Sequence, residues 1–402
     1  MSPPPLPGPG DPAAMTLLTG IRDIRAPAAR TSPTLRAAAP ALLLYAAVRM
    51  TGLLILACWA AVEDKSPHTL LSGRWDSVWY ARVAADGYGY EIRLPDGDLH
   101  SDLAFFPLFP ALERAVSAVT PLSVNDAGLL IGWAASLAAA WGIWAVARLI
   151  SGRDALGVVL VGLWGAYPTA FVQSMAYTEA LFTALAAWAL YALLTGRWLT
   201  AGALAVAAGL TRPSGAAVVA AVWVAAAVAL LGARRQGRAF PVRPLLGALL
   251  APLGWCGYVL YVAVREDSPY GYFDVQAGWG NGFDGGRALL GFVADNLASN
   301  VVGGLGLIAA LVLVGWLVVL GVRQGQPLPL VAFTVVMVVT SLVGSGYFGS
   351  RPRLMMPAFG LLLPPAVALL RLRRGYVALV LAGVALASGA YGAFTLLGSG
   401  PP

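Results

Sequence analysis

The residues best suited to chemistry form a compact group of charged and aromatic side chains in the segment RWDSVWYARVAADGYGY at 74–90. If residues 75–86 form a helix, Asp76, Trp79 and Tyr80 lie on one face, because positions i, i+3 and i+4 are neighbours on a helix. Aromatic rings can stack on the faces of a sugar, and a carboxylate among them can take a proton from a hydroxyl. The alternative is an amphipathic helix on a membrane surface, with Asp76 as its cap.

Two charged residues further along interrupt apolar sequence. Glu179, in AYTEALF, opens an apolar run, where it either stabilises a helix N-terminus or adds a second carboxylate to the site. Arg212, in LTRPSGA, is costly inside a membrane, and Pro213 and Gly215 break the helix beside it. An arginine in this setting suits a phosphate or an ion pair, for which Glu179 is the expected partner.

Metal binding is a further chemistry that the acidic segment before residue 103 could support. Asp98, His100 and Asp102 have the identities of metal ligands. Their spacing is loose, however, and acidic loops are usually only solvated. We therefore predict no metal site.

The composition indicates which elements must position these groups. Of 402 residues, 59% are hydrophobic and 11% are charged, against about 25% charged in soluble domains. Because a helical crossing takes roughly 20 apolar residues, the sequence predicts an all-α, polytopic membrane protein of about 11 crossings. The apolar runs are 40–61, 127–150, 155–171, 178–195, 199–211, 214–232, 244–264, 299–321, 329–347, 354–370 and 376–397.

The charge distribution predicts the orientation of these crossings. With the N-terminus inside, the inner segments carry 15 arginines against three acids, whereas the remainder carries ten arginines and Lys65 against 16 acids. This is a positive-inside pattern, so the net charge of +7 reflects topology and does not indicate nucleic-acid binding. Cys58 and Cys256 lie in apolar runs, where we expect buried thiols and no disulfide.

The domain organisation follows from the same pattern. We expect a disordered cytoplasmic tail at 1–39, a single transmembrane domain at 40–397 and a short extracytoplasmic end at 398–402. The long loops are all outer ones, at 62–126, 172–177, 265–298 and 347–353. Any chemistry should therefore take place on the outer face.

The predicted topology also allows us to interpret three more arginines and two prolines. Arg351 and Arg353 lie in the last outer turn, against the positive-inside bias, where they suit an anionic lipid head or pairing with outer acids. Arg49 lies nine residues into the first run and is expected to snorkel to the inner face. Pro107 and Pro110 should interrupt a helix, which makes the segment around them interfacial or re-entrant.

Taken together, several segments resemble a known enzyme family. In fixed order they match the PIG-V-like integral membrane mannosyltransferase that adds the second mannose of glycosylphosphatidylinositol anchors, and its bacterial homologues. The matching segments are VRMTGLLILA (48–57), RWDSVWYARVAADGYGY (74–90), HSDLAFFPLFP (100–110), AYTEALF (176–182), LTRPSGA (210–216) and, more loosely, SRPRLMMP (350–357).

The resemblance implies a type C glycosyltransferase fold that uses polyprenyl-phosphate mannose on the extracytoplasmic face of the plasma membrane, with no nucleotide and no required metal or other cofactor. Asp76 would be the general base, and inversion is expected. Binding of the lipid phosphate would fall to Arg212, Arg351 and Arg353. Binding of the sugar and acceptor would fall to Trp75, Tyr80, His100, Asp102, Tyr177 and Glu179. The acceptor could be a glycolipid, a polysaccharide or a protein.

Two other classes of function remain open. A flippase or transporter of polyprenyl phosphate or glycolipid would also carry intramembrane arginines, but transporters often show internal repeats, and none is visible here. The chain could also be a non-catalytic subunit of another transferase, although the presence of both Asp76 and Arg212 argues against that role.

Overall fold

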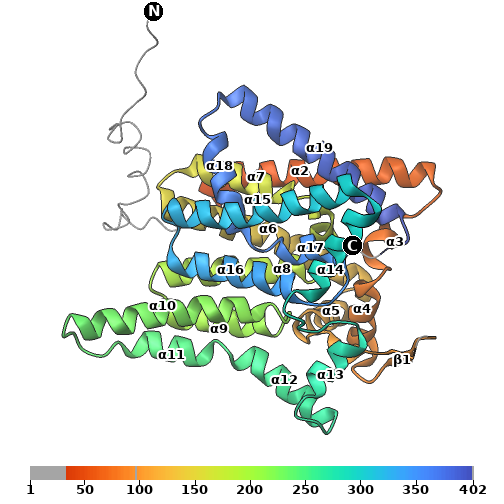
Figure 1. The fold of residues 1–402 in the computed structure, drawn as a ribbon, viewed down its shortest axis with the longest axis horizontal. Coiled ribbons are helices and arrows are strands. Elements are labelled where there is room, and N and C mark those ends of the chain that lie inside the picture. The colour runs from red at the N-terminus through yellow and green to blue at the C-terminus, as the bar shows by residue number, and fades with distance from the viewer. Residues whose placement is uncertain (1–32, 96, 401–402) are drawn as a thin grey trace, which may run out of the picture.

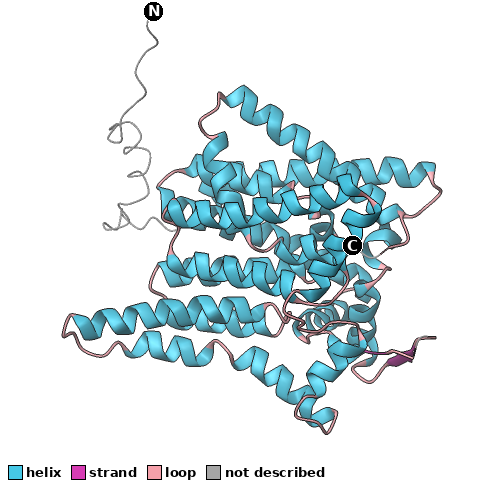
Figure 2. Cartoon of the chain, in the orientation of Figure 1, coloured by secondary structure: helices cyan, strands magenta, loops and turns pink. Residues whose placement is uncertain are grey.

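The computed structural model describes residues 33–95 and 97–400, which are almost entirely helical (Figures 1 and 2). The only strands in this part of the chain are β1 (Glu91–Arg93) and β2 (Leu99–Ser101), which pair antiparallel with Ile92 opposite His100. The expected disordered tail lies outside the described residues up to position 32.

Each expected apolar run corresponds to a helix or to a broken pair of helices. Within residues 33–95 and 97–400, six spans are long and apolar enough to cross a membrane, a pair bent by 76° adds a seventh, and four shorter apolar helices complete the set. The chain is therefore a mostly helical, multi-pass membrane protein, as predicted. In chain order the elements are α2 (Leu35–Val62), α6 (Val124–Ser151), α7 (Asp154–Gly165), α8 (Glu179–Leu194), α9 (Trp198–Gly209), α10 (Gly215–Arg235), α11 (Val242–Leu250) with α12 (Leu253–Arg265), α15 (Val301–Arg323), α16 (Leu328–Val343), α17 (Arg351–Met355) with α18 (Leu363–Leu369), and α19 (Arg374–Leu397).

The first helix begins five residues before the expected start of the membrane domain. It starts at Leu35, where the side chain of Thr34 accepts a hydrogen bond from the Ala37 N–H. This N-cap satisfies one of the free N–H groups of the first turn, so residues 35–39 belong to the helix rather than to the tail.

Helix α6 lies at the centre of the bundle and packs against α2, α5, α7 and α8. Small residues allow this close approach: Gly142 of α6 lies against Ala187 of α8. Trp144 of α6 and Trp164 of α7 are fully buried. Between helices in lipid, such van der Waals packing replaces the hydrophobic effect as the main attraction.

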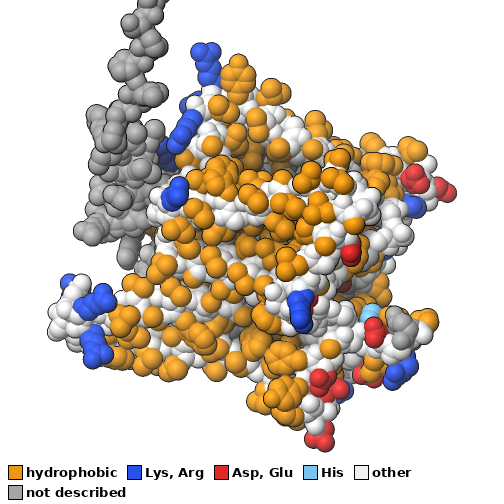
Figure 3. Space-filling model, in the orientation of Figure 1, with side chains coloured by type: hydrophobic (Ala, Val, Ile, Leu, Met, Phe, Trp, Pro, Cys, Tyr) orange, Lys and Arg blue, Asp and Glu red, His pale blue; other side chains and the backbone are white. Residues whose placement is uncertain are grey.

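The outside of the bundle is apolar, as a surface that faces lipid must be (Figure 3). Helix α15 is an example, because Leu305, Val312 and Trp316 are all exposed on it. Cys58 and Cys256 are exposed as well, which corrects the expectation that they are buried. In a membrane protein an apolar run predicts a lipid-facing side chain as readily as a buried one.

The loop at 62–126 folds into a layer of short elements at one end of the bundle. Its helix α4 (Asp76–Asp86) matches the expected helix at 75–86. The expectation that Pro107 and Pro110 interrupt a helix is wrong, because Pro107 is the N-cap of α5 and Pro110 lies in its first turn, where no N–H is needed. The other short elements at this end and elsewhere are α3 (Pro67–Ser72), η1 (Asp102–Ala104), α5 (Leu108–Val119), η2 (Ala170–Ser174), α13 (Gly271–Gly278), α14 (Arg287–Ser299), η3 (Phe348–Ser350) and η4 (Phe359–Leu362).

Charged side chains separate toward the two ends of the bundle (Figure 3). Arginines gather at the end that holds the α10–α11 and α18–α19 connections, and most visible acids lie at the opposite end, beside the layer of short elements (Figure 1). This separation has the form that the positive-inside rule requires.

Cysteine labelling tests the predicted orientation. In a Cys58→Ala, Cys256→Ala background, Glu91→Cys at the hairpin should react with a membrane-impermeant maleimide in intact cells. Gln236→Cys, at the basic end, should react only after the cells are opened. Both positions are exposed, so neither result depends on burial. The reverse pattern would place the acidic end in the cytoplasm and contradict the orientation.

Candidate active site

The site is built around Asp76, the first residue of α4. The residue before it, Trp75, has a positive φ of 53°, a strained conformation for a bulky side chain. Arg74 holds this turn: its guanidinium lies 4.0 Å from the centre of the Trp75 ring and donates to the carbonyls of Leu396 (2.6 Å) and Gly398 (2.9 Å). The strained turn is thereby fixed to the end of α19.

The Asp76 carboxylate faces Arg353 of α17, with 3.0 Å between Oδ2 and Nη1. The Nε of Arg353 lies 3.3 Å from Oε1 of Glu179, and the same Oε1 pairs with Nη1 of Arg212 at 2.5 Å. Two carboxylates and two guanidinium groups from α4, α8, the α9–α10 turn and α17 therefore form one neutral cluster.

The members of the cluster differ in exposure, which separates their roles. The Glu179 side chain is 1% exposed, and its carboxylate is held by the two arginine ion pairs. The Arg212 and Arg353 side chains are nearly buried, whereas that of Asp76 is 30% exposed. Glu179 is therefore the fixed counter-charge of the two arginines, and Asp76 is the carboxylate that a substrate can reach.

Hydroxyl groups surround the cluster. Tyr177 accepts a hydrogen bond from the Asp76 backbone N–H at 3.2 Å, and Arg353 lies over its ring. The Tyr80 hydroxyl and the Thr178 hydroxyl lie 3.2 Å apart, and Thr178 also accepts from Arg212. Burial raises the pKa of the Tyr80 and Tyr177 hydroxyls, so both stay neutral and can donate hydrogen bonds.

Of the predicted site residues, the structure thus brings together Asp76, Tyr80, Tyr177, Glu179, Arg212 and Arg353. The ion pair between Arg212 and Glu179, expected as an alternative to phosphate binding, is present. Thr178, which contacts Tyr80 and Arg212, is a residue of the site that the sequence analysis did not identify. Its position in the sequence between Tyr177 and Glu179 was the signal that could have placed it in the site.

Two predicted phosphate or sugar ligands are engaged elsewhere. Arg351 donates to the carbonyls of Ser341 and Gly344 and lies over the ring of Phe348, so it closes the end of α16. The ring of Trp75 stacks with Arg74. We find no contact of either side chain with the cluster among the described interactions.

His100 and Asp102 support the outer layer. Asp102 is fully buried and accepts hydrogen bonds from the N–H groups of Gly89 and Tyr90, which closes the loop before β1. Burial raises the pKa of this carboxyl group, and the two N–H donors oppose that effect. His100 stacks on Trp279 at 4.0 Å between ring centres. No group of three metal-ligating side chains occurs within residues 33–95 and 97–400.

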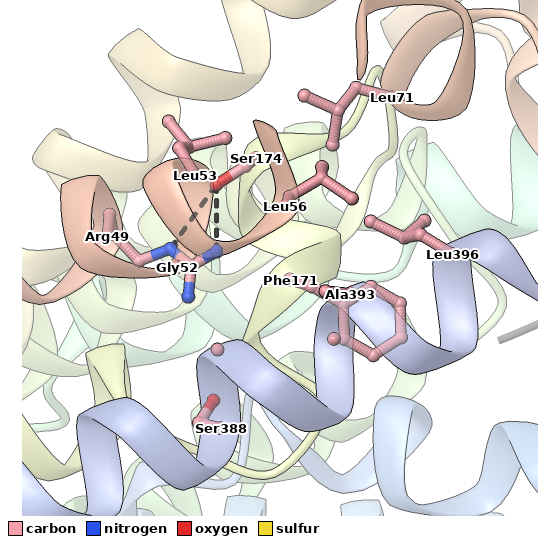
Figure 4. Close-up of a pocket in the computed structure, with 12 residues that line it drawn as sticks. Arg49, Gly52, Leu53, Leu56, Leu71, Phe171, Ser174, Ser388, Ala393 and Leu396 are labelled. Carbon is pink, nitrogen blue, oxygen red and sulfur yellow. Dashed lines mark hydrogen bonds between the residues drawn. The ribbon is translucent and has the colours of Figure 1, made fainter. Parts of the chain in front are cut away.

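The expectation that Arg49 snorkels to the inner face is wrong. Its guanidinium is buried and donates to the hydroxyl of Ser174 (2.9 Å from Nη2) and to the carbonyl of Gly165 (3.2 Å). Figure 4 shows it beside a narrow cleft between α2 and α19, with Ser388 on the opposite wall. Arg49 therefore fixes the segment that leads to Tyr177 and Glu179, and the three hydrogen-bonded atoms offset part of its desolvation cost.

The comparisons with known proteins add little to this picture. No family model and no curated protein matches the chain. Among solved structures it is similar to the crystal structure of ArnT from Cupriavidus metallidurans bound to undecaprenyl phosphate, with a TM-score of 0.48 and 15% identity over 88% of this chain and 74% of that one. The apo structure of ArnT gives a TM-score of 0.48 and 16% identity over 79% and 70%. At such low similarity, the activity has to be inferred from the residues of the chain itself.

The ion-pair cluster predicts strong coupling between Glu179 and Arg212. Glu179→Gln leaves two guanidinium groups without their shared carboxylate, and breaking a buried pair costs about 3–5 kcal/mol. Arg212→Met should also lower the Tm, and the double variant should lose about 0.5–3 kcal/mol less than the sum of the two. Thermal unfolding in detergent measures this, with Asp154→Asn at an exposed pair as the control. Additive losses would show that the two residues do not interact.

A buried acid behind the cluster predicts a pH dependence of stability. Glu113 of α5, outside the spanning helices, is fully buried with no hydrogen-bond partner for its carboxyl oxygens, and burial raises its pKa to about 9. Between pH 4.5 and 9 the unfolded chain releases this proton and the folded chain keeps it, so the free energy of unfolding falls as pH rises, by at most about 1.4 kcal/mol per pH unit.

Glu113→Gln replaces the titratable carboxyl group by a neutral amide of the same size. The variant should match the wild type near pH 5 and exceed its Tm by several degrees near pH 8. The exposed Glu266→Gln serves as the control. An equal Tm difference at both pH values would mean that Glu113 is ionised in the folded protein.

Proposed function

We propose that the protein is a type C glycosyltransferase of the plasma membrane, which moves mannose from a polyprenyl-phosphate donor to an acceptor hydroxyl on the extracytoplasmic face. The observation that carries this proposal is the cluster itself: one accessible carboxylate, Asp76, beside two arginines that a buried carboxylate, Glu179, holds in place. A base next to a phosphate-binding pair is what transfer from a sugar phosphate requires. The ordered motifs of the mannosyltransferase family support the choice of mannose.

In the reaction we propose, the acceptor oxygen attacks the anomeric carbon from the side opposite the phosphate, which inverts the configuration. The bond from that carbon to the phosphate oxygen breaks, and its electron pair leaves with the polyprenyl phosphate. Asp76 takes the proton of the acceptor hydroxyl as the new bond forms. Arg212 and Arg353 stabilise the negative charge on the departing phosphate.

In this mechanism, Arg353 couples binding of the donor to release of the base, Asp76. The Nη1 atom of Arg353 lies 3.0 Å from Oδ2 of Asp76. A phosphate that binds the guanidinium competes with Asp76 for it, so binding of donor releases the carboxylate toward the acceptor. The buried Glu179 keeps Arg353 in place during this exchange, because it pairs with the Nε atom and not with the Nη1 that Asp76 uses.

The roles of the other components follow from this arrangement. The partners are the lipid-linked donor, the bilayer and an acceptor that is a glycolipid, a polysaccharide or a protein. We propose no cofactor and no metal. The competing proposal, a flippase for polyprenyl phosphate or glycolipid, would use the same arginines but would not need Asp76.

Transfer of label from radiolabelled polyprenyl-phosphate mannose to a membrane lipid extract tests the function. Asp76→Asn should lower the rate by about 10²–10⁴-fold, because it removes the base and keeps the size of the side chain. Asp86→Asn, at the other end of the same helix, should transfer as the wild type does. The Tm of both variants controls for folding.

The outcomes separate the candidate functions. Equal transfer by wild type and Asp76→Asn would make Asp76 structural and contradict its role as base. Donor binding without transfer by any variant, together with movement of the lipid across vesicles, would favour the flippase.

A further inference from the structure

A second cavity lies at the same end of the bundle as Asp76, between the last turns of α2 and α19 and the loop before α17. Its volume is 480 Å³, which is within the range of about 300–1,000 Å³ found for small-molecule sites. None of the groups assigned above to phosphate binding or proton transfer lines it. What it binds is therefore a separate question.

The walls of the cavity are unusually rich in aromatic rings. Trp59 of α2 faces Tyr391 and Phe394 of α19, and Tyr347 closes the side toward α17. These four side chains are 38–66% exposed. Rings that stay this open at the end of a membrane bundle present flat apolar faces to whatever occupies the cavity.

The polar groups of the cavity are acceptors and hydroxyls. The Oγ1 atom of Thr169 is buried and has no hydrogen-bond partner, although it belongs to a residue that lines the cavity. Thr395 donates its proton to the carbonyl of Tyr391, which leaves the lone pairs of its oxygen free to accept. Glu63 adds a half-exposed carboxylate. Because the Thr169 oxygen is buried, Thr395 and Glu63 are the polar side chains of the wall that a ligand can reach.

The charge of the lining argues against an anionic ligand. It includes one carboxylate and no lysine or arginine. The two cations beside the wall are engaged: Lys65 pairs with Glu63 and donates to the carbonyl of Leu397, and Arg74 donates to the carbonyls of Leu396 and Gly398. A phosphate finds two cations close together at Arg212 and Arg353 instead. A plain hydrocarbon chain would offer no hydrogen-bond donor to Glu63 or to the free lone pairs of Thr395. The lining fits a neutral ring that carries hydroxyl groups, because such a ring offers both apolar faces and hydrogen-bond donors.

Two walls of the cavity are connected to the reactive cluster, one by hydrogen bonds and one by the chain itself. On one side, Arg74 holds the carbonyls of Leu396 and Gly398 at the end of α19 and stacks on the residue before Asp76. On the other, the chain runs from Tyr347 and Gly349 directly into α17, which carries Arg353.

We propose that this cavity binds the sugar or polyol ring of a neutral glycolipid and is the acceptor subsite of the transferase; the acceptor role, though not ring binding, rests on the function proposed above. The alkyl part of the lipid would extend along the apolar outer surfaces of α2 and α19. The acceptor hydroxyl would then approach Asp76 from the cavity, while the donor phosphate lies at Arg212 and Arg353.

Binding of short amphiphiles tests the proposal without any turnover. The probe is hexyl β-D-glucopyranoside, and the controls are tetraethylene glycol monohexyl ether, which has the same tail and no ring, and hexyl phosphate. Saturation-transfer NMR titrations use the full-length protein in nanodiscs, with empty nanodiscs subtracted. The variants are Trp59→Leu, Tyr391→Leu and Thr395→Val. The matched control is Trp316→Leu, an exposed aromatic of α15 outside the cavity.

We expect saturable binding of the glucoside that each aromatic variant weakens about tenfold and Thr395→Val about fivefold. Trp316→Leu should bind the glucoside as the wild type does. None of the three cavity variants should change the binding of hexyl phosphate. Equal competition by the ethylene glycol ether would show an alkyl groove and overturn the proposal. So would unchanged glucoside binding in folded Tyr391→Leu and Trp59→Leu proteins.

The acceptor role is tested separately, so that its failure is distinct from failure of the transferase proposal. Tyr391→Leu should raise the KM for the lipid-extract acceptor at least fivefold with little change in kcat, and Asp76→Asn should bind the glucoside with wild-type affinity. If the wild type transfers but Tyr391→Leu keeps its KM, the acceptor role is wrong and the transferase stands. If nothing transfers while ring binding behaves as expected, the transferase proposal fails and the ring site remains.

Discussion

The Arg353 guanidinium lies between two carboxylates, 3.0 Å from Asp76 and 3.3 Å from Glu179, and these three residues come from α17, α4 and α8. Without that cation, the buried Glu179 would depend on Arg212 alone, and α17 would lose its polar attachment to the outer layer. Breaking such a buried pair costs several kcal/mol, whereas replacing all its members by apolar groups is often neutral. Stability alone therefore does not explain four charges at this place, which is a reason to assign them chemistry.

The backbone around the cluster carries strain and is held from outside. The positive φ of Trp75 costs about 1–3 kcal/mol, and the fixed contacts of Arg74 with the end of α19 keep the turn in that conformation. Arg49 fixes another part of the site, because its hydrogen bond to Ser174 anchors the segment that supplies Tyr177 and Glu179. Two arginines outside the cluster thus determine where its acids lie.

The fold was predictable because periodicity and hydrophobicity act locally: every apolar run became a helix or a broken pair of helices. Of the site, Asp76, Glu179 and Arg212 could be found because a charge in an apolar or aromatic setting has to be explained. Arg351 and Arg353 were indistinguishable by sequence, since they are two residues apart in one turn; only the direction of each side chain shows that Arg353 meets the acids and Arg351 closes α16. The direction of the side chain also decides whether a cysteine faces lipid or is buried, and whether Arg49 is anchored in the protein or snorkels to the surface.

The distribution of charge gives the two ends of the proposed reaction different positions. Arg212 and Arg353 adjoin Glu179, whereas the aromatic cavity beside α19 is lined by a carboxylate and hydroxyls. In the reaction we propose, the anionic donor and the neutral acceptor ring would therefore occupy different places at this end of the bundle. Inversion requires two places, because the attacking oxygen and the leaving phosphate must lie on opposite sides of the anomeric carbon.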